Sequence, residues 1–187
     1  MELKTVYFAK PGRENTEEVL RIAKERANEL GIKTVLIAST SGETAVKAAE
    51  FFKGMKVVAV SHAAGFREPD SQEFSAENRE IFEGKGGVIL TTTHAFSGVS
   101  RAIRRKFNTY VIGDMIAYTL RLFGEGMKVV CEIAIMAADS GLASTEEDII
   151  VIAGTGHGAD TAAVLTPVNS HDFFDLKIKE ILCKPHF

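Results

Sequence analysis

Hydrophobic positions along the chain form short aliphatic runs that alternate with longer amphipathic segments. The runs are rich in Val, Ile and Leu, which is typical of strands that are buried on both faces of a parallel sheet. We expect strands at residues 6–9, 34–38, 56–60, 87–91, 148–153, 162–166 and 177–183. We expect helices at residues 16–30, 44–52, 76–83, 110–123 and 127–138.

This alternation predicts an α/β fold, with a mainly parallel sheet between two helical layers in a three-layer α/β/α arrangement. No linker, repeat or low-complexity tract divides the chain, so residues 1–187 are expected to form a single domain. Strands 148–153 and 162–166 are close enough in sequence to pair, so the last strands are expected to be mixed or antiparallel. Polar and apolar residues alternate at 177–183, which predicts an edge strand.

Two expected helix starts carry the pattern of a capping box. In the first, Asn15 is the expected N-cap and Glu18 reaches back to it. In the second, Thr40 and Glu43 have the same relationship. The second box lies in a segment that also suits phosphate binding, so both interpretations of residues 39–44 are kept.

Composition narrows the class of protein. With 187 residues and a net charge of −3, the chain lacks the basic excess of a nucleic-acid-binding protein, and the basic segment 101–106 is expected to be the exposed face of a helix. Charged residues interrupt the most apolar stretch, 111–138, which argues against a membrane span. The excess of apolar residues in this stretch is typical of either a homo-oligomer or a thick hydrophobic core.

Other features of the composition concern the protein's environment. The N-terminus lacks the apolar core of a signal peptide, which predicts a cytoplasmic location. Cys131 and Cys183 are expected to be buried free thiols. Gln72 is the only glutamine, and the scarcity of heat-labile amides predicts a thermophilic source.

Open α/β sheets bind ligands beyond the carboxyl ends of their strands, and four loops of this chain occupy such positions. The first loop joins a strand to a helix and is rich in hydroxyl side chains. Backbone N–H groups and the helix dipole at this point attract a phosphate, and a glycine lets a ligand approach the backbone. The candidate phosphate-binding residues are Ser39, Thr40, Ser41, Gly42 and Thr44.

The second and third loops carry imidazole and aromatic side chains. Phe66 can stack on a planar ring and Arg67 can pair with a phosphate, unless the loop turns Phe66 inward. His94 is a candidate proton donor, although a histidine in such a loop more often serves only as a hydrogen-bond partner. The candidate ligand-binding residues are His62, Gly65, Phe66, Arg67, Thr92, Thr93, His94 and Phe96.

The fourth loop, residues 154–161, matches the Gly-x-Gly-x-x-Gly pattern only in part and leads into a strand. Gly156 is a candidate ligand contact, and Asp160 and Thr161 can also face the ligand. The alternative is a hairpin whose glycines adopt positive φ. Three histidines, one of them in this loop, can meet at one edge of the sheet, but no ligand spacing supports a metal site and none is predicted.

The segment 34–45, Thr-Val-Leu-Ile-Ala-Ser-Thr-Ser-Gly-Glu-Thr-Ala, and the strand at 56–61 resemble the C-terminal α/β domain of pyruvate kinase. In that domain, a strand ends in a Thr-x-Ser-Gly-x-Ser/Thr-Ala loop that receives a phosphate of the allosteric sugar bisphosphate. The resemblance covers most of the chain and implies the pyruvate kinase C-terminal domain-like fold. The catalytic barrel is missing, so no pyruvate kinase activity is expected. Glu43 stands where the kinases often have a basic residue, which departs from the pattern.

The chain is more similar to stand-alone, mostly archaeal proteins of this fold, which are associated with flavin mononucleotide (FMN). This resemblance implies that Thr40, Ser41, Gly42 and Thr44 hold the phosphate of FMN. Loop position then places the flavin ring among the loops that carry His62, Phe66, His94 and Phe96. Two functions follow as hypotheses: an FMN-dependent oxidoreductase, or a non-catalytic sensor of a sugar phosphate or nucleotide.

Overall fold

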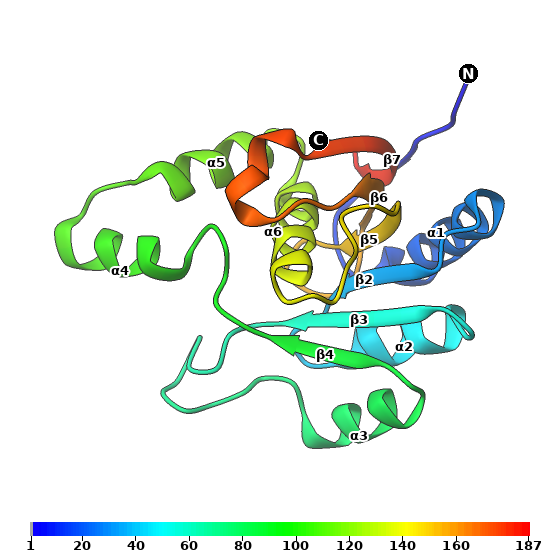
Figure 1. The fold of residues 1–187 in the computed structure, drawn as a ribbon, viewed down its shortest axis with the longest axis horizontal. Helices are drawn as coiled ribbons and strands as arrows, with labels where there is room; N and C mark the ends of the chain where they lie inside the picture. Colours follow the sequence, from blue (N-terminus) through cyan, green and yellow to red (C-terminus); the bar gives the residue numbers. More distant parts are fainter. Residues whose placement is uncertain (1) are drawn as a thin grey trace.

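The computed structural model describes residues 2–187, and its strands form one seven-stranded sheet between two layers of helices (Figure 1). The strand order is β1-β7-β6-β5-β2-β3-β4. The strands are β1 (Val6–Phe8), β2 (Thr34–Ala38), β3 (Lys56–Ser61), β4 (Val88–Thr91), β5 (Ile149–Ala153), β6 (Thr161–Thr166) and β7 (Lys177–Pro185).

The sheet is mainly parallel, as the alternation of strands and helices predicts. Strands β5, β2, β3 and β4 lie side by side in parallel, and β6 runs antiparallel to both β5 and β7. The α/β fold with antiparallel pairing among the last strands is therefore confirmed. The expected edge position of residues 177–183 is confirmed only in part, because β7 lies between β1 and β6 in the strand order, but β1 pairs only with Cys183–Pro185.

The helices cover both faces of the sheet. Helices α1 (Thr16–Leu30), α2 (Glu43–Phe51) and α3 (Ala76–Gly84) pack on one face, and α6 (Glu125–Asp139) packs on the other. Helix α5 (Ile112–Arg121) packs against α6, and α4 (Gly98–Phe107) precedes it in a projection at the left of Figure 1. Short 3-10 helices η1 (Arg13–Asn15) and η2 (Ser170–Asp175) complete the fold.

Alternation of side chains along the buried strands builds two hydrophobic layers. In β2, Val35 and Ile37 pack toward α1 and α2, whereas Leu36 packs toward α6. In β5, Ile150 and Ile152 point to the first layer and Val151 to the second. Because helices cover both faces of the sheet, these strands consist almost entirely of aliphatic residues. This composition allowed the strands to be located from the sequence.

Neither expected capping box forms. The Asn15 amide donates hydrogen bonds to the carbonyls of Lys10 and Gly12 at 2.8 and 3.2 Å, and Glu18 pairs with Arg21 instead. Residue Gly42, with a left-handed backbone, occupies the N-cap of α2 in place of Thr40. Because Gly42 has no side chain to cap α2, the first N–H groups of the helix either contact the Ser39 and Ser41 hydroxyls or, at Thr44, have no acceptor among residues 2–187.

The parallel strands β2, β3, β4 and β5 end at one edge of the sheet, so the loops that follow them lie near one another (Figure 1). The β6 strand begins at the same edge, because it pairs antiparallel with β5. Within residues 2–187, no helix combines the length and the apolar character that a membrane crossing requires.

Candidate functional site

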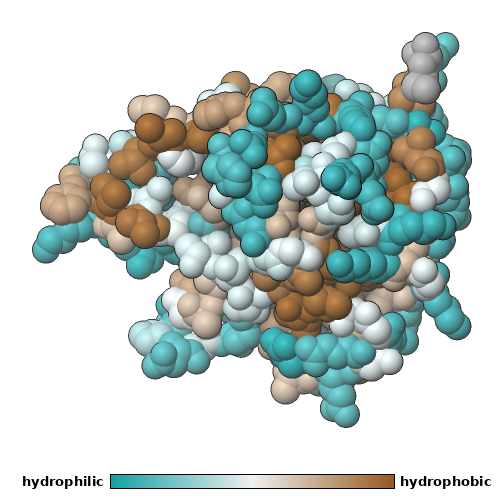
Figure 2. All heavy atoms as spheres, viewed as in Figure 1, coloured by the Kyte–Doolittle hydropathy of each residue, from teal (hydrophilic) through white to brown (hydrophobic). Residues whose placement is uncertain are grey.

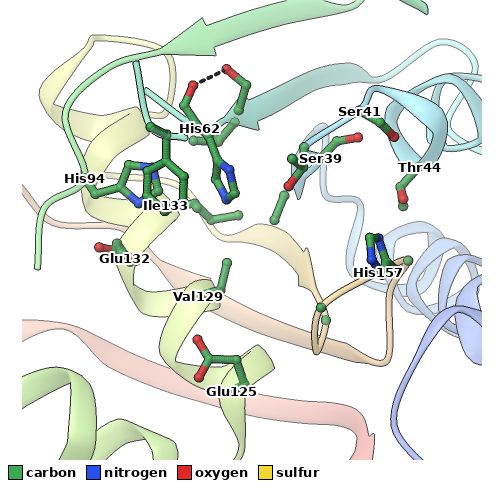
Figure 3. Close-up of a pocket in the computed structure, with 18 of the residues that line it drawn as sticks. Ser39, Ser41, Thr44, His62, His94, Glu125, Val129, Glu132, Ile133 and His157 are labelled. Atoms are coloured by element: carbon green, nitrogen blue, oxygen red, sulfur yellow. Dashed lines mark hydrogen bonds between the residues drawn. The ribbon is translucent and has the colours of Figure 1, made fainter. Parts of the chain in front are cut away.

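A cleft of about 780 Å³ opens at the carboxyl ends of the parallel strands, between the strand-end loops and α6 (Figure 3). Most of the residues proposed from sequence as ligand contacts line it. These are Ser39, Thr40, Ser41, Thr44, His62, Phe66, Arg67, His94 and Gly156. The structure thus brings together all four strand-end loops, although they are far apart in sequence. The fourth loop contributes Gly156.

Five other proposed contacts, Gly42, Gly65, Thr92, Thr93 and Phe96, do not line the cleft. Phe96 is buried and packs edge-to-face on Phe173 at 5.3 Å, beneath α5 and α6. Its backbone N–H donates to Glu132 Oε1 at 3.0 Å, which helps to hold the loop in this orientation. The Phe96 side chain therefore lies outside the expected site for a flavin ring, because it completes a hydrophobic cluster on the other side of the loop.

Gly42 has a structural role that differs from the expected one. Its φ is +97°, and a Cβ at this position would lie 2.5 Å from Phe74 and 2.6 Å from Asn78. The position that a Cβ would occupy at Gly42 therefore faces α3 and the segment before it, and does not face a ligand. Glycine is needed here for the packing of α2 against α3.

The start of α2 forms one end of the cleft and presents uncommitted backbone donors. The N–H of Ala45 donates to Ser39 Oγ at 3.3 Å, and the N–H of Glu43 makes a long contact with Ser41 Oγ at 3.5 Å. Within residues 2–187, the N–H groups of Thr40, Ser41 and Thr44 have no acceptor. Free N–H groups at a helix N-terminus make a site for an anion.

Two cations line the cleft together with this loop. Arg13 precedes α1 and has no carboxylate partner among residues 2–187. Lys47, one turn into α2, makes only a long contact of 3.4 Å with Glu17, and both side chains are largely exposed. Glu43 also lines the cleft and opposes these charges. Sequence periodicity gave no signal for Arg13, because it depends on the packing of the segment before α1 against the β5–β6 loop.

The β5–β6 loop is a hairpin with positive-φ glycines, as the alternative interpretation predicted. Gly156 and Gly158 have φ of +79° and +71°. Asp160 and Thr161 are buried and do not face the cleft. The Asp160 carboxylate accepts hydrogen bonds from the N–H groups of Gly12 and Thr155 at 3.1 and 3.0 Å, so it organises the loop.

The opposite end of the cleft carries a cluster of rings. Phe66 lies 4.0 Å from His62 and stacks on His94 at 5.0 Å, measured between ring centroids. The guanidinium of Arg101, on α4, lies 4.3 Å from the Phe66 centroid. Segment 101–106 is helical as expected, but Arg101 and Arg104 line the cleft and are not simply part of a solvated face.

Hydrogen bonds fix the orientation of both histidines. His62 Nδ1 lies 2.6 Å from Glu73 Oε2, and Glu73 Oε1 accepts from Arg67 Nε at 2.8 Å. His94 Nε2 accepts from the N–H of Ala63 at 3.4 Å. Burial lowers the pKa of His94 below its usual value, against the opposing effect of Glu132. The acceptor role and the lowered pKa both favour a neutral His94 imidazole.

Helix α6 forms the wall of the cleft that faces the loops (Figure 3). Val129 and Ile133 supply its apolar part, and Glu125, Lys128 and Glu132 supply its charges. Lys128 Nζ lies 3.1 Å from Glu125 and 3.2 Å from Glu132. Sequence reasoning missed this wall, although polar residues at spacings of three and four in an otherwise apolar helix were an available signal.

The charges of this wall are largely balanced within it. Burial raises the pKa of Glu125, but the hydrogen bonds and charges of Arg121 and Lys128 outweigh it and hold the pKa below its usual value. Glu125 is therefore ionised at neutral pH.

Among residues 2–187, no three His, Cys, Asp or Glu side chains converge to hold a metal ion. His62 and His94 lie 5.4 Å apart, and His157 lies at the other end of the cleft (Figure 3).

Comparison with known protein families agrees with this arrangement. A family model described as pyruvate kinase, alpha/beta domain, matches residues 17–165. The matched span begins in α1 and ends in β6, so it includes all four strand-end loops and α6. The chain therefore belongs to the pyruvate kinase alpha/beta domain family.

Proposed function

We propose that the cleft binds a phosphorylated cofactor with a planar ring, and that this cofactor is FMN. The observation that carries the proposal is the division of one cleft into two chemically different ends. Uncommitted N–H groups, hydroxyls and Arg13 occupy one end, and the ring cluster of His62, Phe66 and His94 occupies the other. FMN has one phosphate and one flat ring system, joined by a flexible chain.

The phosphate is assigned to the start of α2. Three free N–H groups, the Ser41 hydroxyl and the α2 dipole all favour a negative charge here. Arg13 adds a positive charge that is not already paired with a carboxylate. Glu43 opposes binding, which suits a ligand with a single phosphate at this end better than one with several.

The ring is assigned to the other end, beside the Phe66 cluster. The volume of about 780 Å³ lies within the range of pockets for small ligands, roughly 300–1,000 Å³. When bound, the flavin supplies redox chemistry, while the protein positions it and tunes its charge. Arg101, which has no ion pair among residues 2–187, presents a positive charge to this end, and neutral His94 offers Nδ1 as a hydrogen-bonding group. These features support a flavin-dependent oxidoreductase.

A second function is a non-catalytic sensor of a sugar phosphate or nucleotide. The observation that favours it is a second set of cations in the cleft, namely Arg101, Arg104, Arg121 and Lys128. A single phosphate at the α2 start would leave these groups without a ligand charge. The carboxylates Asp114, Glu125 and Glu132 already pair with three of them, which is why FMN is proposed first.

The two ends can be tested separately by comparing FMN with riboflavin, which has the same ring and no phosphate. Purified protein should be yellow or should become so with FMN, and it should bind FMN at least about 100-fold more tightly than riboflavin. Ser41→Asp should weaken FMN binding by a similar factor and leave riboflavin binding unchanged. Flavin fluorescence quenching measures both affinities.

Ser144→Asp is the matched control. It places the same new charge at an exposed serine before β5, outside the cleft, where the Ser144 hydroxyl accepts a hydrogen bond from the N–H of Glu146 at 3.2 Å. An aspartate carboxylate accepts the same hydrogen bond, so this variant should fold and bind FMN as the wild type does. Equal loss of FMN and riboflavin in Ser41→Asp would contradict the phosphate assignment. Colourless protein that takes up no FMN, but is stabilised against heat by a sugar phosphate, would establish the sensor instead.

A further inference from the structure

One face of α5 carries large apolar side chains that no other part of residues 2–187 covers. We call this surface the α5 outer face. Its residues are Tyr110, Ile112, Met115, Tyr118, Leu122 and Phe123. Between 54% and 78% of the surface of each is exposed, with Ile112 at 73% and Leu122 at 78%. Figure 2 shows the hydrophobic surface of the projection that α4 and α5 form.

The other side of α5 is already used by the fold. Ala117 is buried, and Ile116 and Leu120 pack with it against the α6 cluster. Helix α5 is therefore apolar on two sides, one facing the body of the protein and one facing away. A helix that is hydrophobic nearly all round is normally buried on both sides. The α5 outer face thus lacks the covering that its composition requires.

The size of this surface matches one side of a stable protein interface. Six side chains of this size, each with about 150–250 Å² of total surface, expose together roughly 700 Å². A standard interface buries about 800 Å² on each partner, whereas the largest apolar patch of a monomer is typically about 300–600 Å². The composition, rich in Tyr, Phe and Met, is also typical of interface cores.

Charge indicates what kind of partner covers this surface. Between Phe107 and Leu120 the only charged residue is Asp114, which is buried and paired with Arg104. Arg121, at the end of α5, is paired with Glu125. A helix that lies on a lipid surface uses free Lys and Arg along its own polar side, and α5 offers none. Arg105 and Lys106, which have no ion pair among residues 2–187, lie on α4 instead. An uncharged apolar surface meets no like-charge repulsion when it faces its own copy.

We propose that the α5 outer face binds the same face of a second copy of this chain, in a two-fold symmetric dimer. A shallow groove of about 410 Å³ on this surface is lined by Tyr110, Met115, Tyr118 and Thr119. It can receive a bulky side chain of the second α5. In an isologous dimer, residues at the centre of α5 lie next to the symmetry axis and face their own copies.

Sedimentation equilibrium of the purified wild-type protein tests the proposal directly. The wild type should sediment as a dimer, and Ile112→Glu should raise the dimer dissociation constant at least about 100-fold, because it buries a carboxylate with no partner. Ile81→Glu is the matched control. Ile81 is 39% exposed on α3, which packs on the opposite face of the sheet, so the dimer should persist.

A second measurement tests the symmetry. Thr119→Cys should form a disulfide-linked dimer under mild oxidation, whereas the wild type should not, because Cys131 and Cys183 are both buried. A monomeric wild type, or a dimer that Ile112→Glu leaves intact, would overturn the proposal. So would a monomer that sediments with phosphatidylglycerol vesicles, which would assign the α5 outer face to lipid instead.

Discussion

The Asp160 carboxylate accepts a hydrogen bond from the backbone N–H of Gly12 at 3.1 Å, and so joins the chain segment before α1 to the β5–β6 loop. The same oxygen accepts from the N–H of Thr155 at 3.0 Å, and the other oxygen accepts from the Thr161 hydroxyl at 2.8 Å. Asp160 is fully buried. It therefore holds the two segments that bring Arg13 and Gly156 to the cleft.

Asp160→Ala is expected to lower the free energy of unfolding by about 3 kcal/mol, because one buried donor and two partly buried donors lose their acceptor. Urea denaturation followed by circular dichroism measures the change. Asp148→Ala is the control. Asp148 bonds Thr166 and Lys179 but is partly exposed, so its loss should cost about 1 kcal/mol or less. Equal effects of the two substitutions would show that Asp160 does not organise the loop.

Gly158→Ala should destabilise the fold more than Gly156→Ala. Both glycines have positive φ, +71° and +79°, so each alanine costs about 1–2 kcal/mol of backbone strain. At Gly158 the added Cβ would also lie 2.5 Å from Arg13 Cα and from Thr16 Oγ1, whereas nothing lies within 4 Å at Gly156. Thermal unfolding of the two variants isolates the steric effect, and equal melting temperatures would be evidence against this contact.

Protonation of His94 should destabilise the folded state. Burial lowers its pKa in the folded protein, so the unfolded chain binds the proton more readily. The contribution of His94 to stability is complete above its unfolded pKa of about 6.5 and is lost as pH falls from there through the lower folded pKa. We expect the stability of His94→Gln to fall less than that of the wild type between neutral and mildly acidic pH. If urea denaturation gave parallel pH profiles of stability for the two proteins, His94 would not be the source of the pH dependence.

Cys131 and Cys183 should be inert toward alkylation in the folded protein. Burial raises the pKa of each thiol to about 12, and the thiolate is the reactive form. Iodoacetamide at neutral pH should modify neither residue in native protein and both in urea, as measured by intact mass. Rapid modification of either thiol under native conditions would show that it is accessible through local opening.

Much of the fold could be predicted because its signals are local. The aliphatic run at residues 34–38 and the adjacent Ser-Thr-Ser-Gly segment locate a buried strand and the loop at its carboxyl end. Since parallel strands end at one edge, the positions of Ser39, His62 and His94 near a common cleft also followed from sequence order. Asn15 is the N-cap of α1 as expected, but its amide bonds the nearby carbonyls of Lys10 and Gly12, so no capping box forms there. At α2 the N-cap is Gly42 in place of Thr40.

By itself, the sequence determined the alternation of strands and helices, the two apolar layers and the hydroxyl-rich loop before α2. These features depend on side-chain periodicity over a few residues, which can be recognised from the sequence without knowledge of the fold. Only the tertiary structure decided that Phe96 turns into the core, that Arg13 joins the cleft and that Glu125, Lys128 and Glu132 form its far wall. The direction in which a loop side chain points depends on the space left by segments that are distant in sequence, so local pattern does not specify it.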